Sequence, residues 1–134
     1  MIVLDASAAV ALLVDSGPVG TLVGAAMLQH EVSYSSLLPY EVASTLRRLA
    51  ASATITPQLA VRSLHDAALL NGQQFEFAEI AERVWELRHN ISTYDASYIA
   101  LAELLEVPLL TLDQRLRSAP GVRCEFVEVA TLEV

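Results

Sequence analysis

The sequence predicts an α/β fold with three layers, in which a central, mainly parallel sheet is flanked by helices on both faces. Continuous apolar runs that include β-branched residues, such as residues 2–4, are typical of strands that are buried on both sides. Segments with helical spacing of apolar residues alternate with these strands, as they do in βαβ units. The length of 134 residues suits a single domain, residues 1–134, with one core.

Prolines and capping residues mark where the helices begin. Pro18 suits the first turn of one helix, and Thr56 followed by Pro57 starts another. Ser92, with Asp95 three residues later, matches a capping box. The predicted helices cover residues 7–14, 18–29, 38–49, 57–70, 78–89 and 93–105, with a short helical turn at 115–116.

Apolar runs and alternating patterns predict the strands between these helices. Residues 73–77 alternate polar with aromatic side chains, which is typical of a half-exposed edge strand. Residues 109–112 repeat the opening pattern, because an apolar run again ends in an aspartate. The predicted strands cover residues 2–4, 31–35, 73–77, 109–112 and 124–129.

Composition limits the classes of function. The 16 acidic and 8 basic residues give a net charge of −8, and this balance argues against a broad basic face for nucleic acid. No apolar run is long enough to cross a bilayer and no basic region precedes a signal sequence, so we expect a cytoplasmic protein without a membrane contact. Cys124 is the only cysteine, which excludes an internal disulfide. The apolar content of 54% indicates that another chain covers some hydrophobic surface.

Four carboxylates stand where an open α/β sheet brings side chains to one crevice. Asp5 and Asp113 follow buried strands, while Glu41 and Asp95 lie in the first turns of helices. Each alone has an ordinary explanation as a helix cap or as a charge that complements a helix dipole. Together, these like charges need cations to neutralise them. Oxygen ligands without His or Cys favour Mg²⁺ or Mn²⁺, and such an ion suits hydrolysis of a phosphodiester.

The segments that hold these acids resemble the PIN-domain ribonucleases, and among them the compact VapC-like toxins of prokaryotic type II toxin–antitoxin pairs. The resemblance implies a PIN-like fold and a metal-dependent endoribonuclease, in which water activated by the metal attacks an RNA phosphodiester and leaves 5′-phosphate and 3′-hydroxyl ends. The implied ligands of Mg²⁺ or Mn²⁺ are Asp5, Glu41, Asp95 and Asp113. The matching segments are residues 2–7, 38–42, 94–102 and 109–113.

Two hydroxyls and three arginines accompany the four acids. The resemblance places Ser7 and Thr111 where the family has hydroxyls that support the acids or the water of the metal. Arg48, Arg115 and Arg117 are candidate contacts to RNA phosphates, with surface ion pairs as the alternative explanation. Some relatives carry a further acid soon after the last aspartate, where arginines follow here, so we expect one metal ion.

The resemblance implies an RNA substrate, a VapB-like antitoxin and a homodimer as partners. An acidic chain suits a basic antitoxin whose arginines pair with the carboxylates. A haloacid-dehalogenase-like phosphatase requires an aspartate where Ser7 stands, and both it and a receiver domain require a lysine, which the chain lacks. A PIN-domain RNA-processing nuclease outside a toxin–antitoxin pair, or a non-catalytic PIN binding module, is the open alternative.

Overall fold

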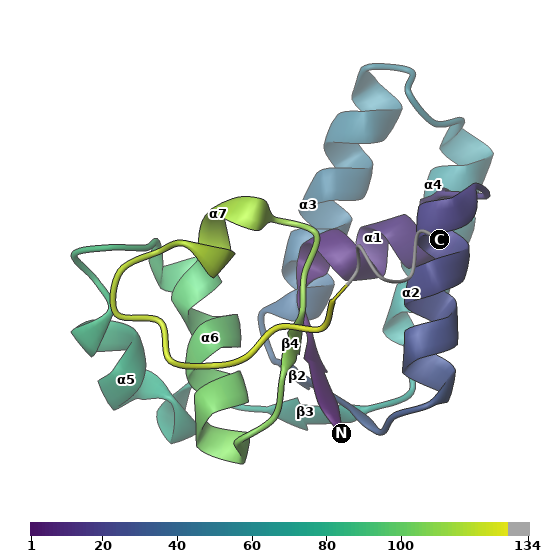
Figure 1. Cartoon of the computed structure of the whole chain (residues 1–134). Coiled ribbons are helices and arrows are strands. Elements are labelled where there is room, and N and C mark those ends of the chain that lie inside the picture. Colours follow the sequence, from purple (N-terminus) through teal and green to yellow (C-terminus); the bar gives the residue numbers. More distant parts are fainter. Residues whose placement is uncertain (129–134) are drawn as a thin grey trace.

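The computed structural model describes residues 1–128, and its centre is a sheet of four parallel strands. The strands are β1 (Ile2–Leu4), β2 (Val32–Ser35), β3 (Gln73–Phe75) and β4 (Leu109–Leu110). Their order in the sheet is β3-β2-β1-β4, so β1 lies between β2 and β4 (Figure 1). Val3 pairs with Ser33 on one side and with Leu109 on the other.

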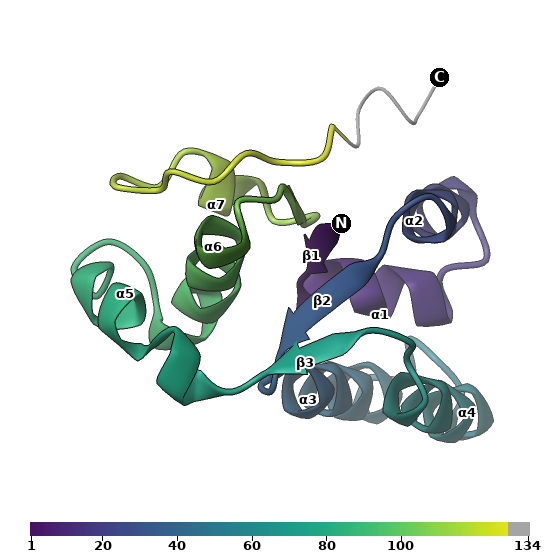
Figure 2. The ribbon, with the colours of Figure 1, turned by 90° about the horizontal axis from the view of Figure 1, so that it is seen from below.

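Helices cover both faces of this sheet, which confirms the predicted fold class. They are α1 (Ala6–Val14), α2 (Pro18–Leu28), α3 (Leu38–Ala51), α4 (Pro57–Ala68), the 3-10 helix η1 (Phe77–Glu79), α5 (Ala81–Glu86), α6 (Thr93–Leu105) and α7 (Gln114–Arg117). Figure 2 shows α5 and α6 on one side of the strands and α1, α3 and α4 on the other. Helix α6 contacts β1, β2 and β4, so it forms the centre of its layer.

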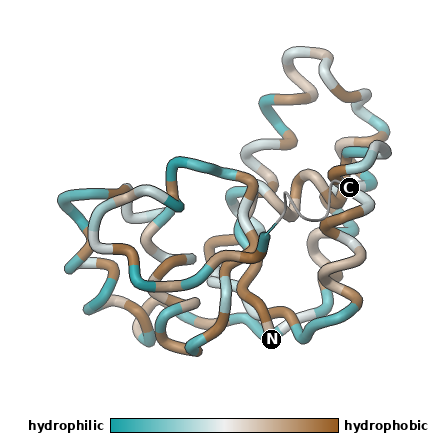
Figure 3. Tube along the Cα trace, in the orientation of Figure 1, coloured by the Kyte–Doolittle hydropathy of each residue, from teal (hydrophilic) through white to brown (hydrophobic). Residues whose placement is uncertain are grey.

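The core is built around β1 and α6. Ile2, Val3 and Leu4 are 0% exposed, as a continuous apolar run predicts for a strand covered on both faces. Every residue of α6 from Ala96 to Ala102 is buried. Figure 3 shows hydrophobic residues along β1 and hydrophilic residues around α5 and α7. Side chains at the end of β1 therefore start from the most protected part of the molecule.

A tight turn separates α1 from α2. Asp15 follows α1, and its Oδ1 accepts a hydrogen bond of 2.7 Å from the Gly17 N–H. A Cβ at Gly20 would lie 2.1 Å from the Asp15 carbonyl oxygen, so glycine is needed for this close approach. The two helices are bent by 114° relative to each other, and within residues 1–128 no single helix is long and apolar enough to cross a membrane.

The helix predicted over residues 78–89 was wrong in extent, because the chain first forms η1 and α5 is short. The Glu76 N–H donates a hydrogen bond of 3.0 Å to Glu79 Oε2, which closes the η1 turn. Ile80 then has φ −122° and ψ 0°, outside the helical region, so η1 and α5 are separate. The same turn ends β3 two residues before the end of the strand predicted over residues 73–77, although β3 is the predicted edge strand.

Two predicted strands near the C-terminus were also too long. The strand predicted over residues 109–112 ends at Leu110, because the Leu112 and Asp113 N–H groups donate to side-chain hydroxyls instead of a neighbouring strand. The strand predicted over residues 124–129 is reduced to an isolated parallel bridge between Phe126 and Leu109, since β4 is too short to pair further. The last residue of that predicted strand lies outside the described range.

Candidate active site

Asp5 lies at the junction between β1 and α1 and is only 4% exposed. It caps α1, because its Oδ1 accepts a hydrogen bond from the Ala8 N–H (3.0 Å). The same oxygen accepts from the Ser7 hydroxyl (2.7 Å), and Oδ2 accepts from the Thr111 hydroxyl. The capping role that the sequence suggests is therefore present, and each hydrogen-bond donor to this carboxylate within residues 1–128 is neutral.

Burial raises the pKa of Asp5 from 3.8 to about 6. Loss of solvation is the largest cause, because an ionised carboxylate is poorly stabilised away from water. The hydrogen bonds from Thr111, Ala8 and Ser7 oppose this shift, whereas the negative charge of Asp95 adds to it. Asp5 is thus a carboxylate that would gain from a nearby cation.

Ser7 and Thr111 connect Asp5 to the chain that follows β4. The Ser7 Oγ accepts from the Leu112 N–H (2.9 Å), and the Thr111 Oγ1 accepts from the Asp113 N–H (3.0 Å). Each hydroxyl therefore donates to Asp5 and accepts from the backbone beyond β4. These bonds hold the two predicted strand-end acids, Asp5 and Asp113, on neighbouring segments.

Glu41 lies in the first turn of α3 and is bound by a tyrosine from α6. The Tyr98 hydroxyl donates a hydrogen bond of 2.5 Å to Glu41 Oε1, and Tyr98 itself is 2% exposed. Burial raises the pKa of Glu41, the Tyr98 hydrogen bond lowers it, and the charge of Asp95 raises it. Burial and the Glu41 carboxylate raise the pKa of Tyr98, so this phenol stays protonated and donates.

Tyr98 is the member of this cluster that sequence analysis missed. Its position three residues after Asp95 places both side chains on one face of α6, which was an available signal. A tyrosine in a helical apolar pattern is nevertheless typical of a core residue. Only the contact across 57 residues to Glu41 distinguishes it.

Asp95 links the other two acids electrostatically. Its N–H donates to the Ser92 Oγ (3.2 Å), so the predicted cap of α6 is formed on the serine side. The negative charge of Asp95 raises the pKa of both Asp5 and Glu41. The structure therefore brings Asp5, Glu41 and Asp95 into one electrostatic environment, at the end of β1 and the starts of α3 and α6.

Asp113 is held differently from the other three acids. It caps α7 by accepting from the Arg115 N–H (3.0 Å), and Arg115 Nη2 donates to its Oδ2 at 2.6 Å. These bonds from Arg115 lower the pKa of Asp113. The Asp113 backbone therefore lies next to Asp5, because Thr111 bonds to both, but the Asp113 carboxylate is paired with Arg115.

The three arginines proposed as phosphate contacts have distinct surroundings. Arg115 is ion-paired with Asp113 at 2.6 Å, although its side chain is 82% exposed. Arg117 fixes the C-terminal segment, because it donates to the Val127 carbonyl oxygen (2.7 Å) and lies over the Phe126 ring. Arg48 is exposed on α3, where it donates to a threonine hydroxyl at 3.1 Å.

The donor set suits a hard divalent cation in charge and chemistry, although the carboxylates are not gathered around one point. Among residues 1–128, no three Asp, Glu, His or Cys side chains lie in an arrangement that would hold a metal ion. In the same range, no basic side chain forms an ion pair with Asp5, Glu41 or Asp95, although the negative charge of Asp95 helps to raise the pKa of Arg115. A cation bound here would have to draw the carboxylates closer together.

Comparison with known proteins gives a consistent family. The PIN domain family matches residues 2–122. Ribonuclease VapC9 of Mycobacterium tuberculosis is 39% identical over 129 residues, which cover 96% of this chain and 98% of that protein.

Two crystal structures show the same fold. VapC20 of Mycobacterium tuberculosis, a sarcin-ricin loop cleaving toxin, has a TM-score of 0.64 at 19% identity, covering 84% of this chain and 90% of that chain. VapBC2 from Rickettsia felis, bound to a DNA fragment from their promoter, has a TM-score of 0.65 at 16% identity, covering 94% and 98%. The family match and the VapC9 identity establish that the chain belongs to the PIN-domain family, as a VapC-like member.

Proposed function

We propose that this chain is an endoribonuclease toxin that depends on Mg²⁺ or Mn²⁺ and is neutralised by a cognate antitoxin. One observation carries the proposal: three carboxylates lie at the carboxyl end of the sheet of a PIN domain, and within residues 1–128 no basic side chain pairs with them. Relatives named ribonucleases, matched over nearly the whole chain, support RNA as the substrate.

Asp5, Glu41 and Asp95 are the proposed ligands of the cation. When bound, Mg²⁺ or Mn²⁺ supplies positive charge that lowers the pKa of an attacking water and neutralises the phosphoryl group. The protein contributes fixed carboxylates: Thr111 holds Asp5, and Tyr98 holds Glu41. Such support of ligands by neighbouring hydrogen bonds is what metal sites need for affinity.

Asp113 is the fourth proposed ligand, and its pairing with Arg115 gives that arginine a second role. An RNA phosphate and Asp113 compete for the same guanidinium, which binds either anion through two parallel hydrogen bonds. When Arg115 turns to a phosphate, the Asp113 carboxylate becomes free for the cation. Substrate binding and completion of the ligand set would then be coupled.

The proposed partners are a VapB-like antitoxin and a second copy of the chain, in the cytoplasm. The VapBC2 structure contains a relative of this fold within a toxin–antitoxin complex, which supports an antitoxin partner. The net charge of −8 suits a basic partner. Leu28 and Leu69 are 90% and 82% exposed, which supports coverage of apolar surface by another chain.

The first test measures cleavage of single-stranded RNA by the purified chain. We expect cleavage with Mg²⁺ or Mn²⁺, none in excess chelator, and recovery when the metal is restored. Asp95→Asn should abolish cleavage without loss of helical circular dichroism. Asp66→Asn, an exposed acid on α4, is the matched control and should keep full activity. Undiminished cleavage in excess chelator would refute the mechanism.

The second test separates a toxin from the open alternatives. Expression of the chain alone should arrest growth, and co-expression of the neighbouring reading frame should relieve the arrest. An active nuclease that is harmless to the cell would favour an RNA-processing role. A folded chain that binds RNA without cleaving it would favour a binding module.

A further inference from the structure

A small cavity of about 260 Å³ lies where β2 ends and α3 and α6 begin. The chain has three Phe, four Tyr and one Trp, and three of these eight rings line this cavity. Tyr40, Phe77 and Tyr94 are 75%, 55% and 60% exposed, although aromatic side chains usually contribute their large apolar area to the core. Aromatic surface gathered around a cavity and left open to solvent indicates a binding surface.

Two buried serines add polar atoms to the same cavity. Ser35 and Ser97 are 2% and 6% exposed, and their hydroxyl oxygens are 3.2 Å apart. Ser97 donates its only hydroxyl hydrogen to the Tyr94 carbonyl oxygen (2.7 Å), so Ser35 is the donor in the serine pair. The Ser35 oxygen therefore keeps lone pairs that can accept a hydrogen bond from an N–H group of a ligand.

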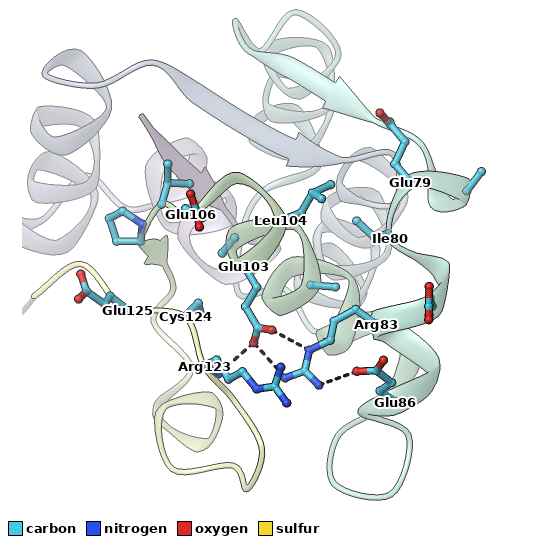
Figure 4. A pocket seen from close by; sticks show the side chains of 16 residues that line it. Glu79, Ile80, Arg83, Glu86, Glu103, Leu104, Glu106, Arg123, Cys124 and Glu125 are labelled. Carbon is cyan, nitrogen blue, oxygen red and sulfur yellow. Dashed lines mark hydrogen bonds and ion pairs between the residues drawn. The ribbon is translucent and has the colours of Figure 1, made fainter.

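The lining of this cavity is uncharged, unlike that of two larger cavities in residues 1–128. A cavity of about 1250 Å³ includes Asp15 and Glu31. Another, of about 790 Å³, lies beside α5 and α6 and is shown in Figure 4. Both linings contain carboxylates, which repel an anionic polymer, and Arg83 and Arg123 offset only part of that charge in the cavity of Figure 4, whereas the lining of the small cavity contains none. The acidic side chains of the cavity in Figure 4 are Glu79, Glu82, Glu86, Glu103, Glu106 and Glu125.

Two residues that line the cavity are sequence neighbours of candidate acids. Tyr40 directly precedes Glu41, and Tyr94 directly precedes Asp95, so the rings and the acids begin the same two helices. We propose that this cavity binds one unpaired nucleobase of the RNA by stacking on its aromatic rings, next to the phosphodiester that is cut. The inference rests on the proposed ribonuclease function and adds the subsite that selects the nucleotide at the cut.

Binding of a nucleobase explains why the lining of this cavity combines aromatic rings and serines and contains no charged side chain. Every nucleobase has a π face that stacks on an aromatic side chain, and unpaired bases are the part of RNA that proteins read in this way. The exocyclic amine or ring N–H of a base can donate to the Ser35 oxygen. A second copy of this chain, or a protein partner, would equally cover aromatic surface, so the test distinguishes these occupants from RNA.

The test uses a short single-stranded RNA that contains one 2-aminopurine, whose fluorescence falls when it stacks. The protein is the full chain carrying Asp5→Asn, so that the RNA stays intact while binding is measured. We expect fluorescence quenching and saturable binding. Tyr94→Ala or Phe77→Ala should weaken binding about 5- to 100-fold and remove the quenching, as loss of one stacking ring does. Tyr94→Phe keeps the ring and should keep both.

Trp85→Ala is the matched control, because Trp85 is 67% exposed on α5 and does not line the cavity. It should leave quenching and affinity unchanged. Equal quenching and affinity in the parent, Tyr94→Ala and Phe77→Ala would overturn the subsite. So would a change in the number of protomers in solution, measured by light scattering, without a change in quenching. Failure of the wild-type chain to cleave RNA would refute the proposed function alone, because quenching is measured without cleavage.

Discussion

Two carboxylates in protected positions are held in opposite ways, Asp5 at the end of β1 and Glu103 near the end of α6. Glu103 accepts from Arg83 Nε at 2.6 Å and from the Arg123 N–H at 2.9 Å (Figure 4). Asp5 accepts from two hydroxyls and a backbone N–H, and is bound by no guanidinium among residues 1–128. Both are shielded from water, since the Glu103 side chain is 13% exposed and Asp5 is 4% exposed.

The difference shows which carboxylate serves the fold and which is available to a ligand. The hydrogen bond to Glu103 raises the pKa of Arg83, so Glu103 stabilises the charged form of this guanidinium. The pKa of Asp5 rises instead, because its neutral partners do not offset burial. A buried acid that is costly to ionise without a cation is a candidate for function.

The largest expected effect is loss of RNA cleavage on Asp5→Asn. The amide keeps an oxygen for Ala8 and Ser7, and its NH₂ can donate to the Thr111 hydroxyl, so the fold should persist. The proposed cation loses a charged ligand, and we expect cleavage to fall at least about 100-fold, because removing even an outer supporting partner costs about 10- to 100-fold. Cleavage rates and the thermal midpoint without metal measure the two effects.

The midpoint of Asp5→Asn in chelator at pH 7 should equal or exceed that of the wild type, because a costly buried charge is removed. A variant that unfolds below the wild type and cleaves at the wild-type rate would reverse the comparison. Asp5 would then serve the fold in the way that Glu103 does.

The second effect is the pH dependence of stability without metal. Because the pKa of Asp5 is about 6 in the folded chain and near 3.8 unfolded, the folded state binds the extra proton between these values. The contribution of Asp5 to stability is therefore full at low pH and is lost as pH rises from about 4 to 6, on the order of 3 kcal/mol. Denaturant unfolding of the wild type and Asp5→Asn across this range, in excess chelator, isolates the contribution.

The contribution of Asp5 is read from the difference between the stability curves of the wild type and Asp5→Asn, because Asp113 changes stability with pH in the opposite direction. Arg115 lowers the pKa of Asp113, so its contribution to stability is gained as pH rises. This contribution is present in both proteins and cancels. Parallel curves for the two proteins between pH 4 and 6 would show that Asp5 titrates in its ordinary range.

The third expected effect is a loss of stability on Glu103→Gln, which tests the ion-paired carboxylate near the end of α6. The neutral amide cannot balance the charge of Arg83. Its NH₂ group also replaces one of the two carboxylate oxygens that accept from Arg83, so an N–H donor would then face the guanidinium N–H groups. We expect a loss of about 2 kcal/mol in the free energy of unfolding. The rate of RNA cleavage should not change under conditions where the variant is folded.

Glu86→Gln is the control for this pair, because Glu86 contacts the same Arg83 but its side chain is 51% exposed. Surface ion pairs contribute little, so its stability should change by less than about 0.5 kcal/mol. Equal losses for Glu86→Gln and Glu103→Gln would mean that burial does not distinguish the two contacts.

The sequence was sufficient to predict the layers, the parallel sheet and the strand end and helix starts on which Asp5, Glu41 and Asp95 lie. Apolar runs and helix starts are local patterns, and the carboxyl ends of parallel strands meet at one edge of a sheet. The expectation that these acids bind one cation rested in addition on the resemblance to the PIN-domain ribonucleases, and it stays a prediction.

Contacts between distant side chains were beyond this kind of inference. The hydroxyls of Ser7 and Thr111 capture the backbone after β4, which shortened the predicted strand. The Tyr98 hydroxyl contacts Glu41, which lies 57 residues away in the sequence. Phe77 was predicted in a strand and instead lines a cavity. Each outcome depends on the conformation of a side chain, which spacing along the chain does not determine.

The smallest effect is expected from Tyr98→Phe, which removes one hydroxyl and keeps the buried ring. Tyr98 connects the two layers of helices at the candidate site, because it lies on α6 and holds Glu41 on α3 at 2.5 Å. Without it the Glu41 carboxylate can rotate, and we expect the affinity for Mn²⁺ to fall about tenfold, the lower range for losing a supporting hydrogen bond. Electron paramagnetic resonance of free Mn²⁺ measures this without cleavage.

Tyr34→Phe is the matched control, since its hydroxyl donates to the Leu70 carbonyl oxygen at 3.4 Å, away from the acids. It should bind Mn²⁺ as the wild type does, and both variants should stay folded. Equal Mn²⁺ affinity in Tyr98→Phe and the wild type would leave Tyr98 as a core residue with a satisfied hydroxyl. Reduced affinity in Tyr98→Phe alone would extend the contrast with Glu103. The neutral Tyr98 hydroxyl would then orient Glu41 for a cation, whereas the Arg83 guanidinium occupies Glu103 and would exclude one.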